Sequence, residues 1–181
     1  MDAQIGFDTS GIKAQLKTIF ERDQKTRTGK DSVAYMQYID STNLIQIEKL
    51  LLEYGWMGRS MVGDTGNSAL FLVIQHSNLE TQIKYVPLLQ KSVEIGESRP
   101  SNLALMQDRI LMRQGKKQIY GSQVVPNNSG GQEFYPIEDE VNVNIRRVKL
   151  GMQPIEEYAK LFGIEYKIPK QYVSTPKNRT I

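Results

Sequence analysis

The sequence predicts a mainly α-helical fold, a compact single-domain bundle of antiparallel helical hairpins with one small β-hairpin near residues 117–136. Three observations support this class. Apolar residues recur at helical spacing along most of the chain, short links rich in glycine or proline separate these segments, and no strand–helix–strand alternation of a Rossmann or barrel fold is present. A chain of 181 residues can bury a sizeable core. We therefore expect one helical domain over residues 1–166, with N-terminal helices in 1–41, and a polar C-terminal tail at 167–181.

The first helix is expected near the N-terminus. Residues 1–8 carry no periodic pattern and are expected to fray. From Thr9 or Ser10, a small hydroxyl residue can cap a helix with an apolar stripe, which consists of Ile12, Leu16, Ile19 and Phe20. The polar stretch 23–30 indicates a loop, and a second, short helix is predicted from Asp31.

Three longer helices are predicted in the middle of the chain. Thr42 is expected to cap the first, which ends at Gly55. The second covers residues 79–93, where Pro87 marks a kink or the true start. Ser101 is expected to cap the third. Each of the last two is followed by a glycine.

The periodicity changes after residue 116. Segments 118–125 and 132–135 look extended, and the link between them, 126–131, is full of turn-forming residues, so the pattern predicts a β-hairpin. A final helical pair is predicted over 141–151 and 154–162, the second opened by a proline.

Composition excludes several classes of function. The net charge of +3 and the pI near 9.0 come from scattered basic residues, so nucleic acid is not expected as a partner. The absence of cysteine excludes disulfides, thiolate catalysis and sulfur-ligated metals. The longest apolar run is too short for a transmembrane segment. The protein is expected to be soluble, either cytoplasmic or exported with its signal peptide removed, and its oligomeric state is left open.

The stretch 54–77 contains the densest run of glycines, the most apolar segment, the only Trp and the only His. A polar, glycine-rich segment with Trp56 and Arg59 leads into a helix apolar enough to be buried, which ends in Gln75 and His76. The glycines resemble a phosphate cradle, but no strand precedes them and no Lys-Ser or Lys-Thr pair follows. Turn geometry is the alternative explanation for them.

Several motifs along the chain together resemble a known family. They are Trp56-Met57-Gly58-Arg59-Ser60-Met61-Val62-Gly63, Leu72-Val73-Ile74-Gln75-His76, Leu105-Met106-Gln107-Asp108-Arg109, Gln118-Ile119-Tyr120-Gly121-Ser122-Gln123, Pro136-Ile137-Glu138-Asp139 and the run from Arg146 to Tyr158. Their order and spacing resemble the bacterial domain-of-unknown-function family numbered 6624, over about residues 42–162. The resemblance implies a bacterial protein and no particular activity. Met57 departs from the family pattern, which often has Pro there.

His76 and Arg109 are the strongest candidates for chemistry. His76 is the only side chain that titrates near neutral pH without perturbation, and it lies at the end of a buried stripe beside Gln75. It is either a general acid or base or a core histidine that fastens the helix end. Arg109, among apolar neighbours, is either paired with a carboxylate or directed at an anionic ligand. Arg59 precedes a helix start, where anions are favoured.

A polar group from the predicted hairpin completes the candidate site. Tyr120 is a possible acid or hydrogen-bond donor, and Gln118 and Gln123 are possible ligand-orienting amides, unless all three fasten a sheet edge. Ser60 and Ser122 lack the nucleophile-elbow pattern. One His, no Cys and no clustered acidic spacing leave no metal site, and no cofactor is predicted.

Two functions remain open. In the first, His76 and Tyr120 (catalytic) converge with Gln75, Arg109, Gln118 and Gln123 (ligand-binding), and Trp56 and Arg59 close a pocket for a small polar or anionic ligand, with metal-free acid–base chemistry. In the second, the same residues form a buried polar network in a non-catalytic binding or interaction module.

Overall fold

The computed structural model describes residues 9–169, which form seven α-helices, one 3-10 turn and one two-stranded sheet. Five helices come first: α1 (Ser10–Thr28), α2 (Val33–Tyr54), α3 (Arg59–His76), α4 (Leu79–Glu94) and α5 (Pro100–Arg113). Strands β1 (Val124–Pro126) and β2 (Gln132–Phe134), the 3-10 turn η1 (Glu140–Asn142), α6 (Val143–Val148) and α7 (Ile155–Lys160) follow. The predicted fold class is confirmed. Residues 1–8 and most of the predicted tail, 170–181, lie outside the described part.

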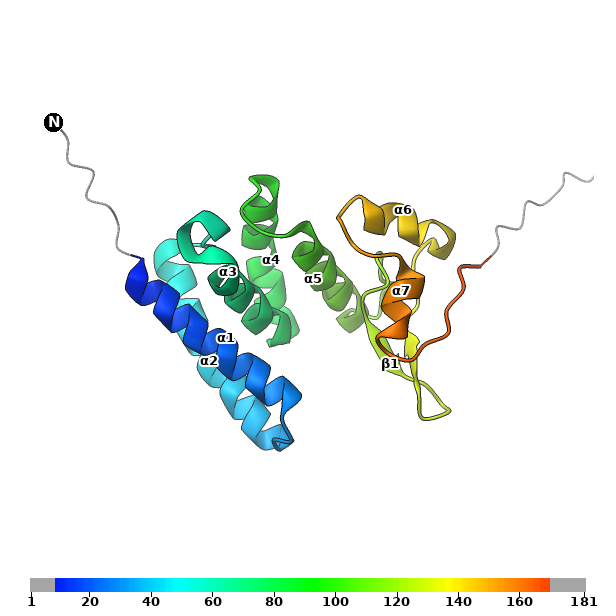
Figure 1. Cartoon of the computed structure of the whole chain (residues 1–181), viewed down its shortest axis with the longest axis horizontal. Helices are drawn as coiled ribbons and strands as arrows, with labels where there is room; N and C mark the ends of the chain where they lie inside the picture. The colour runs from blue at the N-terminus through cyan, green and yellow to red at the C-terminus, as the bar shows by residue number, and fades with distance from the viewer. Residues whose placement is uncertain (1–8, 170–181) are drawn as a thin grey trace, which may run out of the picture.

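Helix α3 is the centre of the helical part. It contacts α1, α2, α4 and α5, and Figure 1 shows it between the α1–α2 pair and the α4–α5 pair. Its second half is apolar and buried, with Ala69, Leu70 and Ile74 fully inaccessible to solvent. The prediction that this helix is buried is therefore confirmed. Because α3 contacts four other helices, other elements meet at both of its ends.

The C-terminal part has a small core of its own. Ile137, Val143 and Ile155 are buried together, and Phe134 and Tyr166 pack against them. Strands β1 and β2 pair antiparallel, with Val124 opposite Phe134. In Figure 1 this part lies beside α5, on the far side of α5 from α1 and α2. None of the helices within residues 9–169 has the length and apolar character needed to cross a bilayer.

The predicted loop at residues 23–30 is wrong, because α1 continues to Thr28. Asp23 and Thr26 are 1% and 4% exposed and extend the buried stripe of Leu16 and Ile19 by another two turns. Thr26 Oγ1 donates to the carbonyl of Asp23 at 2.8 Å, which satisfies this hydroxyl inside the protein. A polar stretch of sequence thus forms a buried helix face.

Two predicted helix starts are also wrong. Residues 33–54 form one helix, capped by Ser32, whose side chain accepts from the Tyr35 amide at 3.2 Å. Thr42 lies inside this helix, and its hydroxyl donates to the Tyr38 carbonyl instead of capping. Helix α5 begins at Pro100, and not after Ser101, because proline is favoured in the first turn.

The glycine-rich stretch is helical from Arg59, with one break at Gly63 (φ 74°). The predicted strand 118–125 is wrong except at its end, because only Val124–Pro126 pairs with a neighbouring strand. Residues 118–123 instead form a loop with Gly121 at φ 65° and a single parallel bridge from Gln118 to Ile137. Tyr120 and Ser122 therefore do not share a face of a paired strand.

Candidate functional site

The C-terminal end of α3 gathers charged side chains from α1, α2 and α5. We call this group the α3-end cluster; it consists of Asp23, Arg27, Asp40, His76, Arg109 and Arg113. His76 Nδ1 lies 2.9 Å from Asp23 Oδ1. Arg109 Nη1 donates to the carbonyl of Gln75 at 3.3 Å, and Arg113 Nη1 donates to that of Ser77 at 2.5 Å.

His76 is held by a carboxylate in a defined orientation. Burial by itself raises the pKa of Asp23, but the hydrogen bond and charge of His76 and the charge of Arg27 outweigh burial, so the pKa lies below 3.8. Asp23 is thus ionised at neutral pH and can only accept, so His76 Nδ1 carries the proton. The other ring nitrogen, Nε2, has no hydrogen-bond partner among residues 9–169. His76 remains 19% exposed.

The Asp23–His76 contact predicts an acid-sensitive contribution to stability. A carboxylate with a lowered folded-state pKa stabilises the fold above its ordinary pKa of 3.8, and this contribution is lost as pH falls through the folded pKa. We expect Asp23→Asn to lower the free energy of unfolding at pH 7 by roughly 1–3 kcal/mol. Chemical denaturation from pH 7 down to about 2 should then show a shallower decline for the variant than for the wild type. Asp31→Asn, at an exposed position, is the control. Parallel declines for Asp23→Asn and the wild type would contradict the assignment.

Asp23, Asp40 and His76 place three possible metal-ligand atoms within 4.8 Å of one another. Arg27 Nη2 forms an ion pair with Asp40 and lies 3.6 Å from Asp23 Oδ1. The guanidinium therefore already provides the positive charge between the two carboxylates. This explains the acidic grouping without a metal ion.

Arg109 differs from Arg27, because no carboxylate in the described chain forms an ion pair with it. Its Nε donates to Gln123 Oε1 at 3.0 Å and its Nη1 to Gln75 O, both uncharged acceptors. Nη2 has no partner among residues 9–169 and is not enclosed by them. The pKa of Arg109 is lowered mainly by burial, and further by repulsion from Arg113 and Arg27. Arg109 is thus a partly buried cation near two further cations.

The charge of the cluster is positive. Three guanidinium groups face two carboxylates, which leaves one positive charge when His76 is neutral. The negative end of the α3 dipole favours cations here, but it amounts to only about half an elementary charge. Helix geometry therefore explains why arginines collect at this end and does not neutralise them. An anion is the complementary ligand.

Asp108, the neighbour of Arg109, points elsewhere and holds the 119–122 loop. Its carboxylate accepts from the backbone amides of Ile119, Tyr120 and Ser122 at 2.7 to 3.2 Å. Burial raises its pKa in spite of these bonds. On the other side of the loop the buried Arg147 donates to the carbonyl of Tyr120 at 2.7 Å. The loop is thus fixed through both its amides and its carbonyls.

The structure separates the predicted site residues into three places. His76, Gln75, Arg109 and Gln123 meet at the α3 end. Tyr120 belongs to the loop held by Asp108; its pKa is raised by burial and by Asp108, and no interaction within residues 9–169 joins it to His76. Gln118 is fully buried in the same region, where its amide binds the Gln123 and Tyr135 backbone.

Trp56 and Arg59 lie at the opposite end of α3 from His76. Trp56 Nε1 donates to Ser98 Oγ at 3.1 Å, and Arg59 Nη2 donates to Gly96 O at 2.6 Å. An anion does bind this helix start, but it is the carboxylate of Glu97, which accepts from the Ser60 amide at 2.8 Å. Gly58 permits the approach, because a Cβ there would lie 2.2 Å from Glu97 Oε2. These residues fasten a turn and do not close a pocket over His76.

The sequence prediction missed four members of the cluster: Asp23, Arg27, Asp40 and Arg113. Asp23 lies one helical turn after Ile19, on the same face as Leu16 and Ile19. This spacing was the one sign in the sequence that Asp23 belongs to a buried helix face. Arg27 and Arg113 lie one turn beyond Asp23 and Arg109 on their own helices. Their convergence depends on how α1 and α5 pack on α3, which no local pattern reveals.

A family model, described as a family of unknown function (DUF6624), matches residues 12–170. The match extends beyond the resemblance found at residues 42–162 and includes α1, which supplies Asp23 and Arg27. Comparison with curated proteins and with solved structures gives no match. The α3-end cluster therefore lies entirely within the matched region.

Proposed function

Since the chain belongs to the DUF6624 family, whose function is unknown, we propose from its own geometry that it binds a small anionic compound at the α3-end cluster. The observation that carries this proposal is Arg109, a partly buried guanidinium with two uncharged acceptors, no carboxylate partner in the described chain and an available Nη2. Buried cations are ordinarily paired, so one without an anionic partner indicates a place for a ligand.

Each residue has a role in this proposal. Arg109 anchors the anion through a charge-assisted hydrogen bond, and Gln123 fixes the guanidinium plane through its Oε1. Arg113 adds positive charge nearby. His76, oriented by Asp23, presents Nε2 as the group that accepts a proton from the ligand or returns one. A metal-free proton transfer on a small carboxylate or phosphate compound is the reaction class that these groups support.

Calorimetric titration with inorganic phosphate, sulfate and malonate tests the binding site. We expect Arg109→Met to weaken binding of the best probe roughly 10- to 100-fold, because a hydrogen bond to a charged group contributes about 1.5–3 kcal/mol. His76→Gln should retain binding, because Arg109 and not His76 anchors the anion. Arg99→Met, which removes an exposed arginine paired with Asp64, is the matched control.

The alternative, a structural polar network, predicts a different pattern. In that case Arg109→Met should cost several kcal/mol of stability, as for other broken buried networks. In the proposed site the variant loses binding while its free energy of unfolding changes by less than about 1 kcal/mol. A wild type that binds no probe, together with a strongly destabilised Arg109→Met, would overturn the proposal.

A further inference from the structure

A groove in the C-terminal part of the protein lies apart from the α3-end cluster. It has a volume of about 420 Å³, and none of its lining residues belongs to that cluster. Three half-buried aromatic side chains line it, Phe134, Tyr135 and Tyr166, and we call it the Tyr166 groove. Ile137, which is 7% exposed, provides part of its apolar wall. The groove therefore offers ring surface that a ligand can reach.

Two of these rings meet at a right angle. The ring centroids of Phe134 and Tyr166 lie 5.0 Å apart, and the angle between the ring planes is 85°. The Tyr166 hydroxyl donates to the carboxylate of Glu140, which holds the ring in this orientation. Burial and the contact with Glu140 raise the pKa of Tyr166, so its ring is uncharged at neutral pH. A roughly spherical group can touch both rings of such a corner, whereas a planar group stacks on only one.

The net charge of the Tyr166 groove is negative. Its charged lining residues are one cation and three anions, which leaves two negative charges: Lys117, Glu133, Glu140 and Glu165. Glu133 and Glu165 are exposed and form no ion pair within residues 9–169. The face of an aromatic ring is the negative side of its quadrupole. Rings and carboxylates therefore favour the same kind of ligand, a cation.

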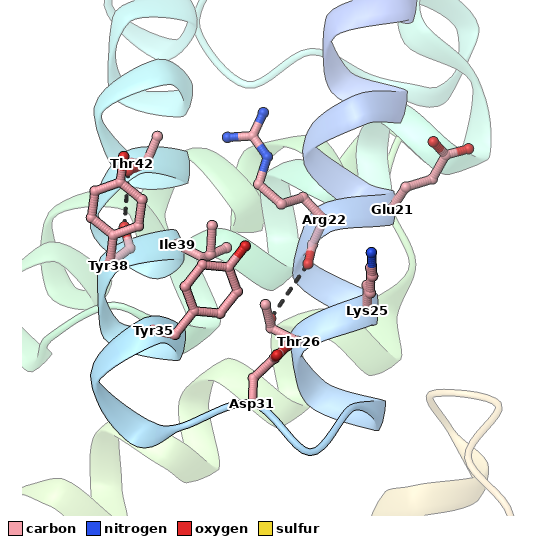
Figure 2. A pocket seen from close by; sticks show the side chains of 9 residues that line it. All are labelled: Glu21, Arg22, Lys25, Thr26, Asp31, Tyr35, Tyr38, Ile39 and Thr42. Atoms are coloured by element: carbon pink, nitrogen blue, oxygen red, sulfur yellow. Dashed lines mark hydrogen bonds between the residues drawn. The ribbon is translucent and has the colours of Figure 1, made fainter.

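The groove between α1 and α2 has aromatic walls without this excess of charge. Figure 2 shows Tyr35 and Tyr38 on its α2 wall, and its volume is about 580 Å³. Its charged lining residues are two cations and two anions: Glu21, Arg22, Lys25 and Asp31. Aromatic walls are thus common to both grooves, and the net charge distinguishes them. The α1–α2 groove can therefore serve as the internal comparison for the Tyr166 groove.

We propose that the Tyr166 groove binds a small quaternary ammonium compound, with its methyl groups against the rings of Phe134 and Tyr166. Such a cation is roughly spherical and has no N–H donor, so it fits a corner of two rings and needs no hydrogen-bond acceptor. The carboxylates of Glu133 and Glu165 attract it through charge. A volume of about 420 Å³ suits a small ligand, because ligand pockets span roughly 300–1,000 Å³. The site is separate from the anion site at Arg109 and is tested without it.

Saturation-transfer difference NMR of the full chain with choline tests the proposal, because the equivalent methyl protons of choline give one sharp signal. Neohexyl alcohol, in which carbon replaces the charged nitrogen of choline, is the matched neutral probe. We expect choline to bind with a millimolar dissociation constant, at least about fivefold tighter than neohexyl alcohol. Phosphocholine should bind more weakly than choline, because its phosphate is repelled by the carboxylates of the groove.

Four variants assign the binding to the groove. Glu133→Gln and Glu165→Gln should each raise the dissociation constant for choline about two- to fivefold, and together about tenfold, without effect on neohexyl alcohol. Tyr166→Leu should weaken binding of both probes. Because Tyr166 also packs on the C-terminal core, circular dichroism melting checks that this variant is folded, and the two glutamine variants test the site without it. Tyr38→Leu, which removes an exposed ring from the α1–α2 groove, is the control and should change neither affinity.

Four results would overturn the proposal. The first is the absence of saturable transfer to choline up to about 50 mM. Equal affinities for choline and neohexyl alcohol would show that the rings bind apolar groups whatever their charge. Loss of choline binding in Tyr38→Leu, with none in the double glutamine variant, would place the cation in the α1–α2 groove. Tighter binding of phosphocholine than of choline would assign the attraction to a cation of the protein.

Discussion

Replacement of Asp108 by Ala should unfold the C-terminal part of the protein at temperatures where the wild type is stable. Asp108 is fully buried, and its carboxylate accepts from three backbone amides of the 119–122 loop. Without it these donors lose their acceptor inside the protein, at about 1–3 kcal/mol each. We expect a loss of roughly 3–6 kcal/mol in the free energy of unfolding, measured by chemical denaturation.

Two variants separate this effect from a general loss of charge. Asp64→Ala removes a carboxylate that is 64% exposed and paired with Arg99, and it should change stability by less than about 1 kcal/mol. Asp108→Asn keeps one acceptor oxygen and should fall between Asp108→Ala and the wild type. Burial raises the pKa of Asp108, because desolvation disfavours the charged carboxylate. The hydrogen bonds from the loop amides act in the opposite direction and stabilise the charged form. Equal stabilities of Asp108→Ala and Asp64→Ala would contradict this role.

Gly121→Ala should have the next largest effect. A Cβ at this position would lie 2.4 Å from Ile155 Cδ1 and 3.0 Å from Ile137 Cδ1, and the backbone φ of 65° is unfavourable for alanine. Strain of about 1–2 kcal/mol and overpacking of about 1–3 kcal/mol predict a total loss of roughly 2–5 kcal/mol in thermal or chemical unfolding. Ile155 is fully buried, so it cannot move aside freely.

A matched glycine separates the two causes. Gly130 has a similar backbone conformation, φ 81°, but a Cβ there meets no atom within 4 Å. Gly130→Ala should therefore show the strain alone. In the Gly121→Ala background, Ile155→Val removes the clashing methyl group and should cost less than it does in the wild type. If Gly121→Ala is no more destabilising than Gly130→Ala, the close packing against Ile155 is not what requires glycine.

Local pattern predicted most of the helices but not the long continuous α2. Ser32 caps α2, and the helix passes through Asp40, Ser41 and Thr42, which together resemble a helix boundary in the sequence. Ser and Thr inside a helix can satisfy their hydroxyls on the preceding turn, as Thr42 does on Tyr38. Packing of the flanking apolar residues on the core then decides the outcome, because propensity is a weak preference that tertiary contacts override.

The 118–123 segment was mistaken for a strand for a different reason. The loss of helical periodicity after residue 116 made it look extended, but Asp108 and Arg147 bind its amides and carbonyls. These two residues come from α5 and α6, which are distant in sequence. Backbone groups satisfied by side chains in this way have no need of a sheet partner.

The candidate site could be predicted in part. His76, Arg109 and Gln123 were identified by residue type and position, and the structure brings them to one end of α3. The orienting Asp23 was missed, because the polar composition after residue 22 indicated a loop. Trp56 and Arg59 were grouped with His76 by proximity in sequence, but a helix of 18 residues places its two ends more than about 20 Å apart.

A small anion is expected to bind beside His76 on Arg109. Because His76 is the only histidine, its imidazole gives one set of NMR signals without assignment by mutagenesis. Titration with phosphate or malonate should shift the His76 Nε2 and Cε1–H signals in a saturable way, and Arg109→Met should abolish the shift while Arg99→Met retains it. Signals that do not move with any of these probes, or that move equally in the Arg109→Met variant, would contradict the account.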